Sequence, residues 1–288
     1  MIRIDTNNIR AVSIQHPLYP KEWKGISDCP QTLYCVGNIE LLAERKFTIV
    51  GSRTTPVYAL KTGMEIAKAL TQAFVIVTGT ADGGDAAAIE GGVTGGGKII
   101  CVLAGGFSAL PQNNLPLLER VVREGGLVLS PHAYDTPVRS FSYEYRNKLL
   151  ALLGEGTLVL GAAEKSGALL TARQAQKRGK PVFALPYAPN THAGVGCNAL
   201  IKNGAYLTET ATDISSRLGV RVSERKTEVV LTENEEKLLS ALRELGEGHL
   251  TDLAEKTGIP VFKARALLSA LEVKGLAVSL GGNRYAPV

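Results

Sequence analysis

The chain has 288 residues, of which 45% are hydrophobic and 20% are charged, and its formal net charge is +5. This length can bury a full core and suits one large and one small domain. No apolar run approaches the ~18–20 residues of a membrane span, and the amino terminus lacks the apolar core of a signal peptide. These features exclude a membrane partner and favour a cytoplasmic protein.

The cysteines and histidines indicate neither metal nor disulfide chemistry. No two cysteines have C-x-x-C spacing, and the histidines are scattered without the spacing of metal ligands. We therefore expect free thiols in a reducing cytosol, no metal site and no cofactor. The cysteines are Cys29, Cys35, Cys101 and Cys197, and the histidines are His16, His132, His192 and His249.

The positive charge is mild and unevenly distributed. Residues 1–232 contain 25 Lys and Arg against 19 Asp and Glu, whereas residues 233–288 contain 7 against 8. Such a balance is compatible with a nucleic-acid partner, and any basic surface belongs mainly to the large domain.

In chain order, residues 1–46 form a lead-in that is expected to pack on the sheet as an edge element, with a short strand at Leu33–Val36. From 47 to about 208, apolar strands alternate with helical stretches. This alternation predicts βαβ units in an α/β, doubly wound, mostly parallel sheet, in a domain at 47–218. The expected strands are Phe47–Val50, Phe74–Thr78, Lys98–Leu103, Leu127–Ser130, Thr157–Leu160 and Pro181–Leu185, and the expected helices are Val57–Thr71, Asp85–Gly91, Asn114–Glu124, Tyr143–Leu153 and Ala168–Arg178.

The carboxyl-terminal part has a different pattern. Residues 219–232 are predicted to be a charged linker, after a helix that begins near residue 210. Three helices and a hairpin with glycine turns follow, which predicts a small winged-helix domain at 233–288. Thr251 is expected to cap its second helix. The three helices are expected at Glu235–Glu244, Asp252–Thr257 and Val261–Lys274.

The stretch Phe47–Arg53, F-T-I-V-G-S-R, reads as a buried parallel strand that runs into a glycine. Ligands of open α/β sheets bind at the carboxyl ends of such strands. Gly51 permits close approach of backbone N–H groups, Ser52 can donate a hydrogen bond, and Arg53 suits a phosphate. The stretch therefore predicts a polyanion site, although a solvated surface arginine explains Arg53 equally well.

A second glycine-rich strand end is Thr78–Asp85, T-G-T-A-D-G-G-D. It places glycines at the start of a helix, where free backbone N–H groups can face an anion. Asp82 and Asp85 argue against direct phosphate contact by their own carboxylates, and we expect them to cap the helix instead.

Cations and aromatic residues are interleaved between residues 139 and 148. This pattern suits single-stranded nucleic acid, because cations follow phosphates and an aromatic face stacks on a base. A solvated helix start with one aromatic in the core is the alternative. The candidate residues are Arg139, Phe141, Tyr143, Arg146 and Lys148.

Two further helix starts follow later strands. Ser166 and Gly167 open one helix, in which Thr171 lies one turn later, and free N–H groups there would hold a phosphate. A glycine turn opens another short helix, with Asn198 and Lys202 as candidate ligands. Ordinary helix caps are the alternative. No nucleophile–base pair or nucleotide fingerprint accompanies these sites, so the pattern favours a binding protein over an enzyme.

Together these stretches resemble the bacterial DNA-processing protein A, or Smf, family from about Tyr19 to the carboxyl terminus. Their order and spacing are more specific than any single motif. The stretches are L-Y-C-V-G-N at 33–38, I-V-G-S-R at 49–53, G-T-A-D-G-G-D at 79–85, L-A-G-G-F at 103–107, R-N-K at 146–148, S-G-A-L-L-T-A at 166–172, G-K-P-V-F-A-L-P at 179–186 and G-C-N-A-L-I-K-N-G-A at 196–205.

The resemblance implies an extended Rossmann-like domain, often followed by a winged helix. It implies a homodimer, formed through that domain, that binds single-stranded DNA and loads a RecA-type recombinase in natural transformation or recombination. It implies no established enzymatic activity. The positions that match the family's DNA pocket are Arg53, residues 139–141, Arg146, Lys148, Ser166, Gly167 and Asn198, to which Lys202 is added on charge grounds.

The sequence departs from the family pattern at several positions, which include Pro131 and Lys148 and four residues around the pocket. Gly84 and Ile89 stand where the family has isoleucine and histidine, Gly161 replaces a glutamate, and Tyr187 replaces a glycine. These changes suggest a divergent branch, such as one recruited to phage defence or to a toxin. The alternative function is a nucleotide-sensing or nucleotide-cleaving Rossmann-like protein, which mononucleotides but not DNA would stabilise.

Overall fold

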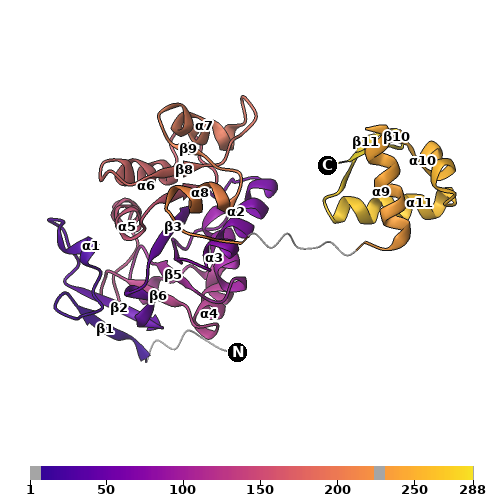
Figure 1. Ribbon diagram of the computed structural model, residues 1–288. Helices are drawn as coiled ribbons and strands as arrows, with labels where there is room; N and C mark the ends of the chain where they lie inside the picture. The colour runs from indigo at the N-terminus through magenta and orange to yellow at the C-terminus, as the bar shows by residue number, and fades with distance from the viewer. Residues whose placement is uncertain (1–7, 224–230, 288) are drawn as a thin grey trace. The chain divides into compact units, whose positions relative to one another are not determined.

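One mostly parallel sheet of nine strands organises the larger of two compact units in the computed structural model (Figure 1). The structure describes residues 8–223 and 231–287. The order of the strands is β1-β2-β6-β5-β4-β3-β7-β8-β9, and the expected α/β fold class is confirmed. The strands are β1 (Arg10–Ser13), β2 (Thr32–Gly37), β3 (Lys46–Val50), β4 (Val75–Thr78), β5 (Ile99–Val102), β6 (Leu127–Ser130), β7 (Thr157–Val159), β8 (Val182–Ala184) and β9 (Tyr206–Leu207).

Helices cover both faces of this sheet (Figure 1). Helices α2, α3, α4 and α8 pack together in one layer, and α1, α5 and α6 in the other. All residues of β3 to β8 are buried, because helices exclude water from both sides. The helices of this unit are α1 (Lys21–Lys24), α2 (Val57–Leu70), α3 (Gly84–Thr94), α4 (Leu115–Arg123), α5 (Ser140–Leu153), α6 (Gly167–Gln176), α7 (Val195–Lys202) and α8 (Ala211–Arg217), with 3-10 turns at Ile39–Leu42, Phe107–Ala109, Gln112–Asn114 and His192–Gly194.

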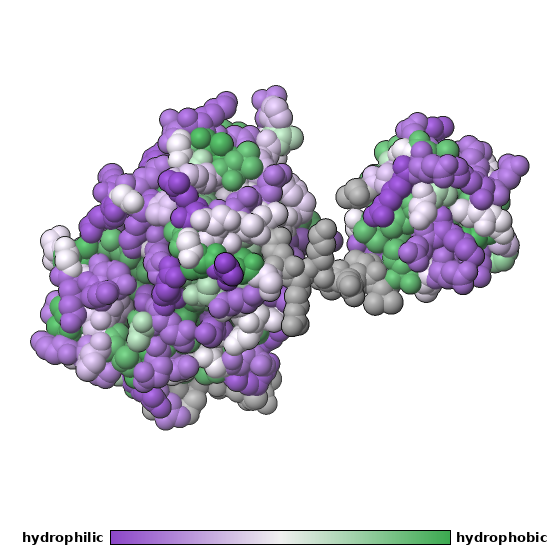
Figure 2. Space-filling model, in the orientation of Figure 1, coloured by the Kyte–Doolittle hydropathy of each residue, from purple (hydrophilic) through white to green (hydrophobic). Residues whose placement is uncertain are grey.

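Apolar side chains of this unit gather in the interior rather than on the surface. The Phe47 ring on β3 lies 5.8 Å from the rings of Phe74 and Phe183. On the face that Figure 2 shows, hydrophobic residues form small separate patches among hydrophilic ones. No helix in the described ranges combines the length and the apolar character that a membrane crossing requires.

The amino-terminal lead-in contributes more than the expected edge element. It adds two antiparallel strands, because β2 pairs with β6 and β1 pairs with β2. Trp23 on α1 is fully buried, and its indole Nε1 donates to the carbonyl of Leu149 on α5 at 3.0 Å. The lead-in therefore shares the core of the larger unit.

The order of the strands reverses between β3 and β7. The chain runs outward from β3 through β4, β5 and β6, then returns to place β7 on the other side of β3. Ligand sites of open α/β sheets form outside the carboxyl ends of the strands at such a reversal. The loops after β3, β4, β5 and β7 therefore meet at the edge where a site is expected.

The smaller unit contains the three predicted helices and a three-stranded antiparallel sheet around its own core. One prediction is wrong: the Nδ1 atom of His249, not Thr251, caps α10 by accepting from the backbone N–H of Thr251. Residues 224–230 of the predicted linker lie outside the described residues. The elements are α9 (Glu233–Leu245), β10 (Gly248–His249), α10 (Leu250–Thr257), α11 (Val261–Val273), β11 (Ala277–Gly281) and β12 (Arg284–Pro287).

A buried carboxylate ties α9 to α11 in this unit. Glu235 accepts from the backbone N–H of Thr232, in a capping box, and from Lys274 Nζ at 2.6 Å. These donors lower the pKa of Glu235 to about 2. The folded unit thus holds this proton more weakly than the unfolded chain, so the stabilisation is present above the ordinary pKa of ~4.3 and is lost as the pH falls towards 2.

We expect Glu235→Gln to destabilise the smaller unit by about 1.5–3 kcal/mol at neutral pH and to have little effect near pH 2. Hydrogen exchange of the amides of residues 231–287, measured across this pH range, checks the prediction. Glu236→Gln is the matched control, because Glu236 is exposed on the same helix. Equal losses in the two variants would contradict the assignment.

Candidate functional site

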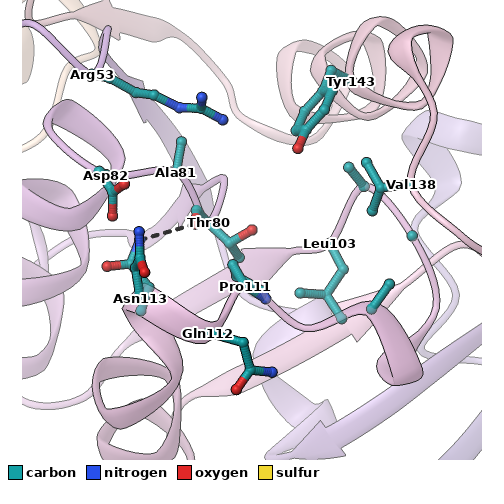
Figure 3. A pocket seen from close by; sticks show the side chains of 14 residues that line it. Arg53, Thr80, Ala81, Asp82, Leu103, Pro111, Gln112, Asn113, Val138 and Tyr143 are labelled. Carbon is teal, nitrogen blue, oxygen red and sulfur yellow. Dashed lines mark hydrogen bonds between the residues drawn. The ribbon is translucent and has the colours of Figure 1, made fainter.

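A pocket of about 260 Å³ opens where the loops after β3, β4 and β5 meet the segment before α5 (Figure 3). Arg53 enters it from the loop after β3, and Tyr143 from the first turns of α5. The remaining lining residues come from the loops after β4 and β5 and from the segment before α5, and apart from the carboxylate of Asp82 they carry small, apolar, hydroxyl or amide side chains. These are Thr80, Ala81, Asp82, Leu103, Ala104, Gly105, Ala109, Pro111, Gln112, Asn113, Asn114 and Val138.

The structure brings together two of the predicted site residues in this pocket. Arg53 is exposed and Tyr143 is 41% exposed, and their polar ends lie at the rim of the pocket in Figure 3. Nearby at the start of α5, Arg139 is exposed, and Phe141 has 62% of its surface exposed. A fixed cation and the exposed ring of Tyr143 thus lie at one opening.

The loop that carries Arg53 is held on both sides. The backbone N–H of Ser52 donates to the carbonyl of Gly161 at 2.8 Å, and the Ser52 carbonyl accepts from the N–H of Gly84 at 3.2 Å. The Ser52 hydroxyl lies within hydrogen-bond distance of the hydroxyls of Thr54 and Thr55. The backbone of Ser52 therefore positions Arg53, and the Ser52 hydroxyl, which is half-buried, stays a predicted donor to a ligand.

Beneath the strand ends lies a buried acid–base pair. Asp85 on α3 and Arg146 on α5 are each about 5% exposed, and Arg146 Nη1 lies 3.6 Å from Asp85 Oδ2. Burial raises the pKa of Asp85 above its ordinary value, while the nearby charge of Arg146 opposes that rise. The guanidinium Nε of Arg146 has no hydrogen-bond partner among the described residues. Arg146 thus faces the interior, which corrects its predicted role as a surface contact for phosphate.

The glycines at these strand ends serve this pair rather than an external anion. The N–H groups of Gly51 and Ala81 donate to the Asp85 carboxylate at 3.4 and 3.2 Å. A Cβ on Gly79 would lie 1.7 Å from Arg146 Nη1, so only glycine leaves room for the guanidinium. The predicted anion at Gly51 is therefore a carboxylate of the protein itself, and Asp85 does not cap α3.

Lys148 lies outside the pocket lining. Its Nζ atom contacts Asp28 Oδ1 at 2.5 Å, and this hydrogen bond lowers the pKa of Asp28. Because Asp28 neutralises it in part, Lys148 is a weaker candidate for phosphate binding than the exposed Arg53.

The start of α6 at Ser166 agrees only in part with what the sequence predicts for it. Ser166 caps α6, because its Oγ accepts from the N–H of Ala168 at 3.2 Å, and Gly167 is exposed beside it. Thr171 is fully buried, and its hydroxyl has no hydrogen-bond partner among the described residues. The prediction that Thr171 contacts a ligand is therefore wrong.

The α7 candidates lie outside the pocket lining. The Asn198 amide makes two bonds with the backbone of Tyr187, accepting from its N–H at 3.0 Å and donating to its carbonyl at 2.9 Å. Asn198 thus holds the Tyr187 backbone and is half-buried, and its contact with DNA stays a prediction. Lys202 is exposed at the end of α7 and does not line the pocket.

Two of the unusual residues form a matched pair. Tyr187 packs against Gly161 and Gly194, where a Cβ would approach the tyrosine side chain to 2.8 and 2.0 Å respectively. The Tyr187 hydroxyl donates to the carbonyl of Leu160 at 2.5 Å. The ring of Tyr58 lies edge-on to Tyr187 at 5.4 Å. Glycine at positions 161 and 194 thus leaves room for the Tyr187 side chain beside the β3–β7 reversal, and a larger residue at either position would clash with it.

The other two departures lie in the interior around α3. A Cβ on Gly84 would lie 2.3 Å from the Cα of Gly51, so glycine lets the loop after β3 rest directly on α3. Ile89 is fully buried in the core. Position 89 therefore offers no acid–base group to a ligand in this chain.

The described residues contain no group of three or more His, Cys, Asp or Glu side chains that is arranged to hold a metal ion. All four cysteines are free thiols. The larger pocket residues that the sequence did not reveal are the amides Gln112 and Asn113, together with Leu103. Their signal is topological: they follow β5, whose carboxyl end lies beside that of β4.

Known proteins share this architecture. The sequence profile of a family described as "DNA recombination-mediator protein A" matches residues 10–219. The DNA processing protein DprA of Bacillus subtilis is 33% identical over 216 residues, which cover 74% of this chain and 72% of that protein. The solved structure of DprA from Streptococcus pneumoniae superposes with a TM-score of 0.68 at 32% identity, over 73% of this chain and 75% of that one.

A second solved structure extends the comparison. It concerns the single-stranded DNA binding mode of DNA processing protein A from Helicobacter pylori, and it superposes with a TM-score of 0.66 at 29% identity. The match covers 73% of this chain and 96% of that one. The profile match spans most of the larger unit, including every strand of its sheet. On these grounds the chain belongs to the DNA recombination-mediator protein A family, also named DprA or Smf.

Proposed function

We propose that this protein binds single-stranded DNA at the carboxyl edge of its sheet and delivers it to a RecA-type recombinase. The observation that carries the proposal is the exposed Arg53 at a pocket that Tyr143 also lines, with the exposed ring of Phe141 in the same first turn of α5. Cations that follow phosphates, next to aromatic rings that stack on bases, are the features that bind single strands.

Each group has a distinct part in the proposed complex. Arg53 and Arg139 are exposed and pair with phosphates of the strand. Phe141 and Tyr143 offer ring faces to two bases. The N-terminus of α6, at Gly167, is a further position for a phosphate through the Gly167 N–H, since Ser166 already accepts from the N–H groups of Ala168 and Leu169.

Delivery to a recombinase and dimerisation through the Rossmann-like domain are proposed from family membership. They are tested separately from DNA binding. Light scattering of the pure protein tests dimerisation, and the DNA-dependent ATP hydrolysis of a RecA-type recombinase, on single strands that this protein has bound, tests delivery. If the protein were a monomer that binds DNA without stimulating the recombinase, the proposal of single-stranded DNA binding would stand, and the proposals of delivery and dimerisation would fall.

Salt titration tests DNA binding itself. We expect the affinity for an oligo-dT to fall with salt at a log–log slope of about −0.7 per phosphate neutralised. We expect duplex DNA of the same length to compete poorly, because paired bases cannot stack on Phe141 and Tyr143. Binding without salt dependence, or equal binding of duplex, would contradict the proposal.

A second candidate is a nucleotide-binding protein, because the pocket lies at the carboxyl ends of the strands, where open α/β sheets bind such ligands. Its volume of about 260 Å³ is below the roughly 300–1,000 Å³ of sites that enclose drug-sized ligands, so only part of a nucleotide would lie inside. A thermal-shift screen separates the candidates, because stabilisation by mononucleotides but not by oligonucleotides would favour this second function. We propose no enzymatic activity for either.

We propose that the smaller unit is a winged helix that contacts protein rather than duplex DNA. Helix α11 carries the cations Lys263 and Arg265 beside highly exposed apolar residues, since Phe262 is 79% and Val273 is 85% exposed. Reading of duplex DNA needs a mainly basic face.

A chain that ends at residue 230 is expected to keep its affinity for oligo-dT within about twofold, which corresponds to about 0.4 kcal/mol. The larger unit has a core of its own and should fold without the smaller one. Fluorescence anisotropy measures the affinity. A tenfold loss would assign the smaller unit to the DNA-binding surface.

A further inference from the structure

Helix α11 turns an uncharged stripe of residues away from the core of the smaller unit. Ala264, Leu268 and Leu271 are buried in that core. On the opposite side of the helix, four exposed residues follow one another at helical spacing, so they form one line along its surface. The line consists of Phe262, Ala266, Ser269 and Val273. Its two ends, Phe262 and Val273, are 79% and 85% exposed.

The other two helices of this unit carry charges on their outward sides. The exposed outward residues are Glu233, Glu236, Lys237, Ser240 and Arg243 on α9, and Thr251, Asp252, Glu255 and Lys256 on α10. A helix face that stays in water is normally polar and charged, as these two are. The uncharged stripe of α11 therefore has the composition of a surface that a partner covers.

The stripe is self-complementary in shape, because large side chains stand at its ends and small ones in its middle. If a second copy lies antiparallel to it, Phe262 of each copy meets Val273 of the other, and Ala266 meets Ser269. A twofold axis relates the two copies, so every contact occurs twice. Small residues at the crossing point let the two helices approach closely.

Charges beside the stripe select the antiparallel arrangement. Arg265 and Glu272 lie close to two helical turns apart, which places them on the same flank of α11. In an antiparallel pair this flank faces its own equivalent, so Arg265 of each copy meets Glu272 of the other. A parallel pair brings opposite flanks together and loses both ion pairs.

The local contacts of these two residues leave their charges available. Arg265 Nη2 donates to the side-chain oxygen of Asn283 at 3.0 Å, and Glu272 accepts from the backbone N–H of Ser279 at 2.8 Å. Both partners are neutral groups. The flank therefore offers two charges of opposite sign to a second copy.

We propose that α11 is a self-association surface, at which two copies of this chain pair through antiparallel α11 helices. The proposal rests on the proposed function in one respect, that the smaller unit contacts protein. One helix pair buries less than the roughly 1,200–2,000 Å² of a standard interface, so the contact is weak between free chains. It becomes effective where another interface already joins the two chains, because the second contact is then intramolecular.

Disulfide cross-linking of the full chain under a mild oxidant tests the pairing. Ala266→Cys combined with Ser269→Cys places each new thiol opposite the other one in the second copy, where a disulfide can form. Ser240→Cys combined with Arg243→Cys is the matched control, with the same spacing on the exposed side of α9. We expect dimers to form roughly tenfold faster, or more, in the α11 variant than in the control. Adding Phe262→Ser should remove this advantage.

Charge reversal in the same α11 cysteine variant tests the antiparallel register. Arg265→Glu sets like charges against each other at both ion pairs, and we expect it to slow cross-linking by roughly 3–30-fold. Adding Glu272→Arg should restore the rate to within about twofold. Within one chain the two positions lie about 10 Å apart along the helix, so this rescue reports a contact between copies.

The outcomes separate this inference from the proposed function. Equal rates in the α11 and α9 cysteine variants would overturn self-pairing and leave the stripe to a different protein. A fast rate that Glu272→Arg does not restore would overturn the antiparallel arrangement. Tight binding of duplex DNA that Lys263→Glu abolishes would overturn both the protein contact of the smaller unit and this inference. Binding of oligo-dT by the larger unit is measured separately, on the chain that ends at residue 230.

Discussion

Asp85→Ala is expected to destabilise the larger unit by about 3–5 kcal/mol, the cost of breaking a buried ion pair. The change leaves the Arg146 guanidinium enclosed, with Val102 as its remaining hydrogen-bond acceptor at 3.4 Å. It also leaves the N–H groups of Gly51 and Ala81 without the carboxylate that they contact. Denaturant unfolding, followed by the fluorescence of the single buried Trp23, measures the loss.

Two further variants separate charge from packing. Asp85→Leu combined with Arg146→Leu should recover most of the lost stability, because apolar replacement of a whole buried pair is often neutral. Gly79→Ala should be destabilising although it changes no charge, since its Cβ would displace the guanidinium. If the double variant were as unstable as Asp85→Ala alone, the loss would come from cavity formation rather than from an unpaired charge.

Arg53→Ala is expected to weaken the binding of oligo-dT by roughly 10–150-fold, because a charge-assisted hydrogen bond contributes about 1.5–3 kcal/mol. Arg53 is exposed, so the substitution should leave the fold intact. Lys202→Ala is the matched control, because it removes one exposed cation that does not line the pocket. Its effect should be small, and an equal loss in both variants would point to diffuse electrostatic attraction.

The sequence was sufficient for the parallel sheet because β3 to β8 are continuous apolar runs separated by helical stretches. It was insufficient for β1, in which only Val12 is buried, and for the two-residue strand β9, which gives too short a pattern. These elements depend on pairing with a neighbouring strand, which local composition does not reveal.

The sequence predicted the site residues whose side chains are exposed, but it did not predict those whose position depends on packing in the core. Arg53 and Tyr143 lie at the opening, as the pattern of charges and rings implies. Arg146 carries the same charge but turns inward to Asp85, 61 positions earlier in the chain, and no local motif encodes that contact. Asn198 likewise contacts the backbone of Tyr187.

The central claim is that Arg53 at the pocket rim neutralises a phosphate of a bound single strand. The most direct measurement is the salt dependence of oligo-dT binding by the unaltered protein and by Arg53→Ala. We expect the log–log slope to become less steep by about 0.7, the contribution of one phosphate on a single strand. An unchanged slope, with unchanged affinity at low salt, would contradict the account and place the DNA elsewhere on the protein.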